Sequence, residues 1–168
     1  MMMEIREIAL PEEKSALCER VLRALPDWFG NEEALVAYAG SSAKMPLYAA
    51  FVDDAAVGFV TVKAHNPFTA EVYVMGILPA YHRLGIGRAL IARCEKVCRE
   101  SGRRFLTVKT LDASAESEEY ARTRMFYKAM GFCPLEVFPL LWDERNPCLF
   151  LAKYVGRDPV PTVDTVAC

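Results

Sequence analysis

The stretch YHRLGIGRAL, residues 81–90, lies between an extended apolar run at residues 70–78 and a helical pattern. The apolar residues of that pattern recur at the spacing of one helix face; they are Leu90, Ile91, Cys94, Val97 and Cys98. The sequence therefore predicts a strand, a loop with two glycines and then a helix.

This loop has the composition of an anion-binding site. Gly85 and Gly87 let the backbone come close to a ligand. The first amides of a helix have no partner inside the helix, and with the helix dipole they favour phosphate. Arg83 and Arg88 add positive charge at the same place.

The glycine spacing alone is a weak signal. No Gly-Lys-Ser/Thr follows, so the loop is not a P-loop, and the third glycine of the dinucleotide fingerprint is missing. The alternative is a glycine-containing turn that simply precedes a helix.

The surrounding sequence favours one family. The loop resembles motif A of the GNAT acetyltransferase superfamily, in which Gln or Arg is followed by x-x-Gly-x-Gly/Ala after a strand; here His82 stands in the first position. Residues 123–132, TRMFYKAMGF, are similar to motif B, a helix with an aromatic-Tyr pair before a turn and Gly-Phe. The resemblance covers about residues 69–132. Many relatives carry Asn near the position of Tyr120, so contacts of that Asn are not carried over.

Periodicity predicts an α/β fold of order β-α-α-β-β-β-α-β-α-β-β, a mixed sheet with helices on both faces. The predicted strands are residues 5–10, 46–52, 56–63, 70–78, 105–111, 132–139 and 148–154. Helices are predicted from Pro11 to about Leu25, after Asn31 to about residue 39, from the glycine loop to about residue 101, and over residues 118–130. The resemblance implies that two neighbouring parallel strands splay and that pantetheine lies between them. We expect one domain over residues 1–156 and a tail over 157–168.

The resemblance also implies a set of acetyl-CoA contacts. The main chain of Met75, Gly76 and Ile77 would pair with pantetheine. The loop around the pyrophosphate would consist of His82, Arg83, Leu84, Gly85, Ile86, Gly87 and Arg88. Tyr127 aligns with the tyrosine that donates a proton to the departing thiolate in relatives; the alternative is a core aromatic beside Phe126.

Glu71 interrupts an apolar strand, and a lone carboxylate there is costly unless it is exposed or useful. It is a candidate general base, or else a solvated residue at a strand start. Strict alternation places it on one face with Tyr73, Met75 and Ile77.

Two aromatic residues and one histidine are further candidates for the functional site. Trp28 and Phe29 follow the first predicted helix and form either a wall of the acceptor site or a hydrophobic clamp. His65 lies in a predicted loop, where a surface residue is favoured over a base.

Bulk properties exclude several classes of function. A net charge of −2 argues against nucleic acid as a partner. No apolar run is long enough to span a bilayer, and the N-terminus lacks the apolar region of a signal peptide. Six cysteines without a CxxC pair favour a reduced, cytoplasmic protein without a metal site. The sequence leaves open whether the chain forms a homodimer.

The sequence thus predicts an acetyl-CoA-dependent N-acetyltransferase acting on a primary amine, with a small molecule favoured over a peptide or a lysine side chain. A catalytically silent acyl-CoA-binding module is the alternative.

Overall fold

The computed structural model describes residues 1–157, which form a seven-stranded mixed sheet and four α-helices. The strands are β1 (Met3–Ile8), β2 (Leu47–Val52), β3 (Ala55–Ala64), β4 (Thr69–Ile77), β5 (Phe105–Leu111), β6 (Cys133–Asp143) and β7 (Asn146–Tyr154). The helices are α1 (Pro11–Arg23), α2 (Glu32–Ser42), α3 (Ile86–Glu100) and α4 (Glu118–Ala129), with a 3-10 turn η1 (Pro79–Tyr81). The predicted α/β class and element order are confirmed.

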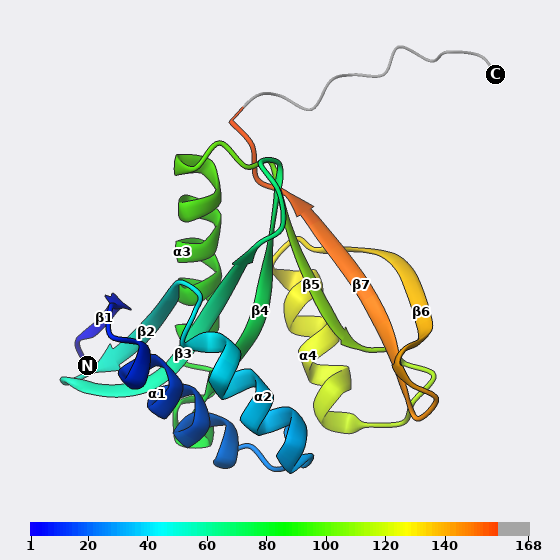
Figure 1. Ribbon diagram of the computed structural model, residues 1–168, viewed down its shortest axis with the longest axis horizontal. Coiled ribbons are helices and arrows are strands. Elements are labelled where there is room, and N and C mark those ends of the chain that lie inside the picture. The colour runs from blue at the N-terminus through cyan, green and yellow to red at the C-terminus, as the bar shows by residue number, and fades with distance from the viewer. Residues whose placement is uncertain (158–168) are drawn as a thin grey trace.

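Helices cover both faces of the sheet (Figure 1). Helices α1 and α2 share one core with β2, β3 and β4, built around residues such as Leu22 and Phe59. Helices α3 and α4 share a second core with the other face, which includes Leu90 and Tyr127. The two cores lie on opposite faces of the sheet, so any gap between neighbouring strands would connect the two faces.

Such a gap lies between β4 and β5. The strand order is β1-β2-β3-β4-β5-β7-β6, and β4 and β5 run parallel. They pair at residues 69–72 with 105–108, although both strands continue beyond that point. In Figure 1 their ribbons lie together at the top and separate toward the bottom of the view. The splay that the family resemblance implied is present.

A β-bulge in β4 corrects one prediction. The register against β3 shifts between Thr61 and Val62, which leaves Tyr73 as the extra residue. Tyr73 and Val74 therefore both face α1 and α2, whereas Met75 packs against the opposite core. The prediction that Glu71 shares a face with Met75 and Ile77 was wrong, because a bulge reverses the alternation beyond it.

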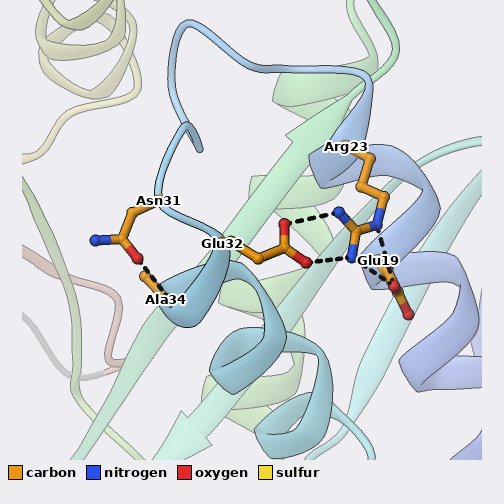
Figure 2. Close-up of polar contacts among 5 residues, drawn as sticks. All are labelled: Glu19, Arg23, Asn31, Glu32 and Ala34. Carbon is orange, nitrogen blue, oxygen red and sulfur yellow. Dashed lines mark hydrogen bonds and ion pairs between the residues drawn. The ribbon is translucent and has the colours of Figure 1, made fainter.

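Local signals place the segment between α1 and α2. Pro11 occupies the first turn of α1, and the Asn31 side chain accepts a hydrogen bond of 2.9 Å from the Ala34 amide at the start of α2. Figure 2 shows Arg23 of α1 paired with both Glu19 and Glu32, at 2.7–3.0 Å. These contacts fix both ends of the loop that carries Trp28 and Phe29.

Element ends differ from the prediction mainly at the two edge strands. β1 begins at Met3, where it pairs with Val52, and ends before the helix that Pro11 starts. β6 continues through Pro139 to Asp143, because proline is tolerated on an edge strand, and the register is irregular there. Asp53 and Asp54 form the predicted turn, both with positive φ.

Of the helices in residues 1–157, none is long and apolar enough to cross a membrane. The predicted tail, residues 157–168, lies outside the described residues except for Arg157.

Candidate functional site

A cavity of about 910 Å³ occupies the gap between β4 and β5. Residues from both faces of the sheet line it, including Tyr38 of α2 on one side and Phe126 of α4 on the other. The cavity also reaches the start of α3 through Gly85 and Arg88. One continuous space therefore joins the predicted phosphate loop to the helices α1 and α2.

The loop before α3 has the geometry that an anion requires. Arg83 and Gly85 adopt left-handed conformations, with φ of 62° and 81°, and together they turn the chain into α3. Gly85 supplies no capping side chain, whereas Asn31 and Ser117 cap α2 and α4. The first amides of α3 are therefore available to a diphosphate, and the side chains of Arg83 and Arg88 line the cavity beside them.

The two glycines of this loop have different tasks. A Cβ on Gly85 would meet no atom within 4 Å, but the left-handed backbone favours glycine. A Cβ on Gly87 would lie 2.9 Å from the ring of Phe126, so Gly87 is needed for the close packing of α3 on α4. Leu84 is 46% exposed and does not line the cavity, which leaves its main chain as the part that can contribute.

His82 reaches back to β4. Its Nε2 donates a hydrogen bond of 2.7 Å to the carbonyl of Ile77, and its ring meets Trp28 edge-on at 6.0 Å. Ile77 belongs to the segment predicted to pair with pantetheine, and its carbonyl is thus already engaged. Met75 and Ile77 face the α3 side of the gap, and Gly76 lies so close to α1 that a Cβ would be 2.9 Å from Val21.

Tyr127 lies in the α3–α4 core and also lines the cavity. Its ring contacts Phe126 and Phe132 at centroid distances of 5.2 and 5.6 Å. It is 6% exposed, and burial raises the pKa of its phenol. The hydroxyl therefore keeps its proton at neutral pH and can act as a hydrogen-bond donor.

Glu71 faces the opposite side of the gap and is held by two basic side chains. It is 4% exposed and lines the cavity. Lys109 Nζ donates to both carboxylate oxygens at 3.1 Å, and His65 Nε2 donates to Oε1 at 2.7 Å. Three hydrogen bonds occupy most of the four acceptor directions of a carboxylate, so one direction at Oε2 is left without a protein donor.

The His65 side chain is partly exposed to solvent but contacts the buried carboxylate of Glu71. Its side chain is 33% exposed, as expected for a loop residue, but the bond to Glu71 gives it a position that the sequence did not predict. The residue does not line the cavity. His65 therefore contacts Glu71 from outside the cavity.

Aromatic rings form the wall on the α1–α2 side. Phe29 meets Tyr38 at 6.0 Å, and Tyr38 meets Tyr73 at 5.5 Å. Trp28 is tied to α4, since its Nε1 donates to Thr123 Oγ1 and its carbonyl accepts from the Tyr120 hydroxyl. Trp28 and Phe29 close the corner after α1 and also line the cavity. Their contact with an acceptor stays a prediction.

Comparison with known families decides the relationship. The acetyltransferase (GNAT) family matches residues 2–132. The chain belongs to the GNAT family. The residues that carry this match include both the α3 loop and the helix with Tyr127.

Individual GNAT proteins resemble the chain to different extents. A mycothiol acetyltransferase from Beutenbergia cavernae is 34% identical over 85 residues, which are 51% of this chain and 27% of that protein. The chain thus spans about a quarter of the length of that relative. A GNAT-family protein from Desulfovibrio desulfuricans has a TM-score of 0.78 at 22% identity, over 92% of this chain and 99% of the other.

An aminoglycoside 6'-N-acetyltransferase in complex with coenzyme A has a TM-score of 0.71 at 17% identity, over 95% of this chain and all of the other. At these identities, the two solved structures show a shared GNAT fold.

Several residues of this GNAT site were not identified from the sequence. Lys109 is a charged residue within apolar β5, as Glu71 is within apolar β4. Opposite charges in two neighbouring strands could have predicted this ion pair from the sequence. Tyr38 and Lys63 gave no such signal, because their meeting with Tyr73 depends on how α2 and β3 pack around the bulge.

Proposed function

We propose that this GNAT protein transfers an acetyl group from acetyl-CoA to the primary amine of a small molecule, by direct attack in a ternary complex. The observation that carries the proposal is the cavity between β4 and β5. It joins a loop suited to a diphosphate on one face to a carboxylate and an aromatic wall on the other. Two substrates bound from the two faces would meet in the gap, and such positioning supplies much of the rate enhancement.

The donor side uses main chain more than side chains. The amides at the start of α3 and the side chains of Arg83 and Arg88 hold the diphosphate. The main chain of Met75, Gly76 and Ile77 accompanies pantetheine, as an added strand would, beyond the point where β5 leaves β4. An amide of the same segment stabilises negative charge on the acetyl oxygen.

Bound acetyl-CoA supplies an activated acetyl thioester. When the amine nitrogen bonds to the acetyl carbon it loses one proton, and the sulfur that departs gains one. Glu71 takes the amine proton, directly or through a water, at the free direction of Oε2. Tyr127 donates to the sulfur from the other face of the gap, and exchange with solvent restores both groups.

The alternatives remain distinct in their expected behaviour. The hydrogen bond from the Tyr120 hydroxyl to the Trp28 carbonyl ties together two segments that line the cavity, and a peptide would have to fit beside it; this favours a small acceptor. A silent acyl-CoA-binding module would not require a carboxylate and a phenol on opposite sides of one cavity.

Release of free thiol from acetyl-CoA in the presence of a panel of amines tests the activity. Turnover with any primary amine supports the proposal, and a peptide as the best acceptor would change the substrate class. Tight coenzyme A binding without turnover across the panel would mean that the chain is a binding module.

Donor specificity gives an independent measurement. Coenzyme A should raise the melting temperature well above the effect of NAD or ATP at the same concentration, because stabilisation by a ligand follows its affinity. An equal or larger shift with NAD would contradict the assignment of the α3 loop.

A further inference from the structure

The charges on the acceptor side of the cavity are mostly positive. Among the described residues that line it, Glu71 is the single acidic side chain. Arg83 and Arg88 belong to the diphosphate loop, and Lys63 and Lys109 lie on the wall that faces α2. An acceptor is therefore held next to two lysines and one carboxylate.

The carboxylate of Glu71 is already neutralised. Lys109 Nζ lies 3.1 Å from each of its oxygens, and the Glu71 side chain is 6% exposed. A buried charge with an opposite charge at hydrogen-bond distance has little attraction left for a third group. Glu71 is therefore poorly placed to bind an ammonium group.

Lys63 is left without a counter-charge. It extends from β3 opposite Glu71, and its Nζ lies 5.6 Å from the centre of the Tyr73 ring. Within residues 1–157 no carboxylate forms an ion pair with it. The free ammonium group thus stands at the end of the aromatic row made by Phe29, Tyr38 and Tyr73.

Together these features describe a ligand. We propose that the acceptor is a primary amine that also carries a carboxylate and an apolar or aromatic body, as an apolar amino acid does. The inference rests on the proposed acetyl transfer. The carboxylate pairs with Lys63, the body packs on the aromatic row, and the amine points toward Glu71 and the gap.

The same charges assist the reaction. A positive environment disfavours an ammonium ion and therefore lowers the pKa of the bound amine toward its nucleophilic, neutral form. A polycation would be repelled by the unpaired Lys63, and the aromatic rings alone would not compensate for several charges.

Matched acceptors test this directly, using the full chain. L-phenylalanine and phenethylamine share an amine and a ring, and L-leucine and 3-methylbutylamine form an aliphatic pair. We expect kcat/KM to be roughly tenfold or more higher for the member with a carboxylate, the range for a hydrogen bond to a charged group. Kanamycin, a polycation, should be a poor acceptor.

Variants locate the effect. Lys63→Met should reduce the preference within each pair by about the same factor, roughly tenfold, because only the carboxylate contact is removed. The rise in melting temperature with coenzyme A should stay as in wild type. Lys96→Met on the exposed side of α3 is the control and should keep the wild-type preference.

The outcomes separate the two proposals. Higher kcat/KM for phenethylamine or kanamycin, or a preference unchanged in Lys63→Met, would overturn the acceptor class while acetyl transfer stands. Absence of thiol release with every amine would instead refute the proposed function, and the acceptor class with it.

Discussion

At the scale of single residues, Glu71 and Tyr127 lie on opposite sides of the gap and have different buried environments. Glu71 is buried where Lys109 and His65 donate hydrogen bonds to its carboxylate. Tyr127 is buried among aromatic rings, and this raises the pKa of the phenol. A weakly acidic hydroxyl of this kind helps by hydrogen bonding as charge develops on sulfur rather than by early proton transfer.

Tyr127→Phe removes this hydroxyl and keeps the ring packing. Turnover should fall by roughly 10²-fold, the low end for a lost general acid. The affinity for acetyl-CoA should stay close to wild type, because the contact strengthens only in the transition state. Steady-state kinetics measures turnover, and calorimetry measures the affinity for acetyl-CoA. Tyr48→Phe, a buried tyrosine outside the cavity, is the control, and equal turnover of the two variants would leave Tyr127 a core residue.

Glu71→Gln keeps the size of the side chain but cannot take a proton. The rate should drop, and the acid limb of the pH–rate profile should flatten or move. Part of that limb belongs to the acceptor, which must also be neutral, so two acceptors with different amine pKa values are compared. A limb that follows the acceptor in both proteins, with little loss of rate, would mean that the amine binds already deprotonated.

At the scale of elements, the start of α3 combines a ligand site with a packing contact. Gly85 has open space around it, and Gly87 is in contact with Phe126 of α4. Substitution at the two positions should therefore have different effects, although both glycines belong to the same sequence motif.

Gly85→Glu should abolish acetyl-CoA binding and leave the fold largely intact, at a cost of about 1–2 kcal/mol for the left-handed backbone. Gly87→Glu should lose binding and also destabilise the packing of α3 on α4, by about 1–3 kcal/mol or more. Calorimetry measures binding, and urea unfolding with circular dichroism measures stability. Undiminished binding in a folded Gly85→Glu protein would contradict the role of the loop.

Elements were predicted well from the sequence where their signals are local. The order of strands and helices, the Asn31 cap and the Asp53–Asp54 turn follow from neighbouring residues. The bulge at Tyr73 could not be predicted, because a register shift depends on which residues of β3 pair with β4. The end of edge strand β6 was predicted too early, because its extension depends on irregular pairing with β7.

At the scale of the whole molecule, one part of the site depends on neighbouring residues and the other on residues far apart in the sequence. The loop that suits a diphosphate is one continuous stretch, and its sequence alone shows the resemblance to the family. The acceptor wall brings together Phe29, Tyr38, Lys63 and Tyr73 from four segments, and its composition emerged only from the packing of α2 on the sheet.

Buried tyrosines give the whole molecule a dependence on alkaline pH. Burial raises the pKa of Tyr120 to about 12, and also raises the pKa values of Tyr38, Tyr48 and Tyr127. Unfolded tyrosine ionises near pH ~10, so above that pH the unfolded chain binds fewer protons than the native one. The stability that these groups contribute is complete below pH ~10 and is lost as pH rises toward the native pKa values.

The urea midpoint should therefore fall between pH ~10 and ~12, since unfolded tyrosine ionises near pH ~10 and native Tyr120 only at about 12. The fall should be smaller in the double variant Tyr120→Phe/Tyr127→Phe, which removes two of the raised groups. A midpoint independent of pH over this interval, or an equal fall in the double variant, would show that tyrosine burial does not control alkaline stability.

The bulge at Tyr73 has a consequence for how such a protein can change over time. Glu71 before it faces the α1–α2 side of the gap, and Met75 and Ile77 after it face the α3 side, so substitutions can alter one side and leave the other alone. The bulge itself has no such freedom. A strand β4 of the same length with strict alternation would turn Glu71 to the side of Met75 and Ile77. This strand can therefore accept new side chains more readily than a change of its register against β3.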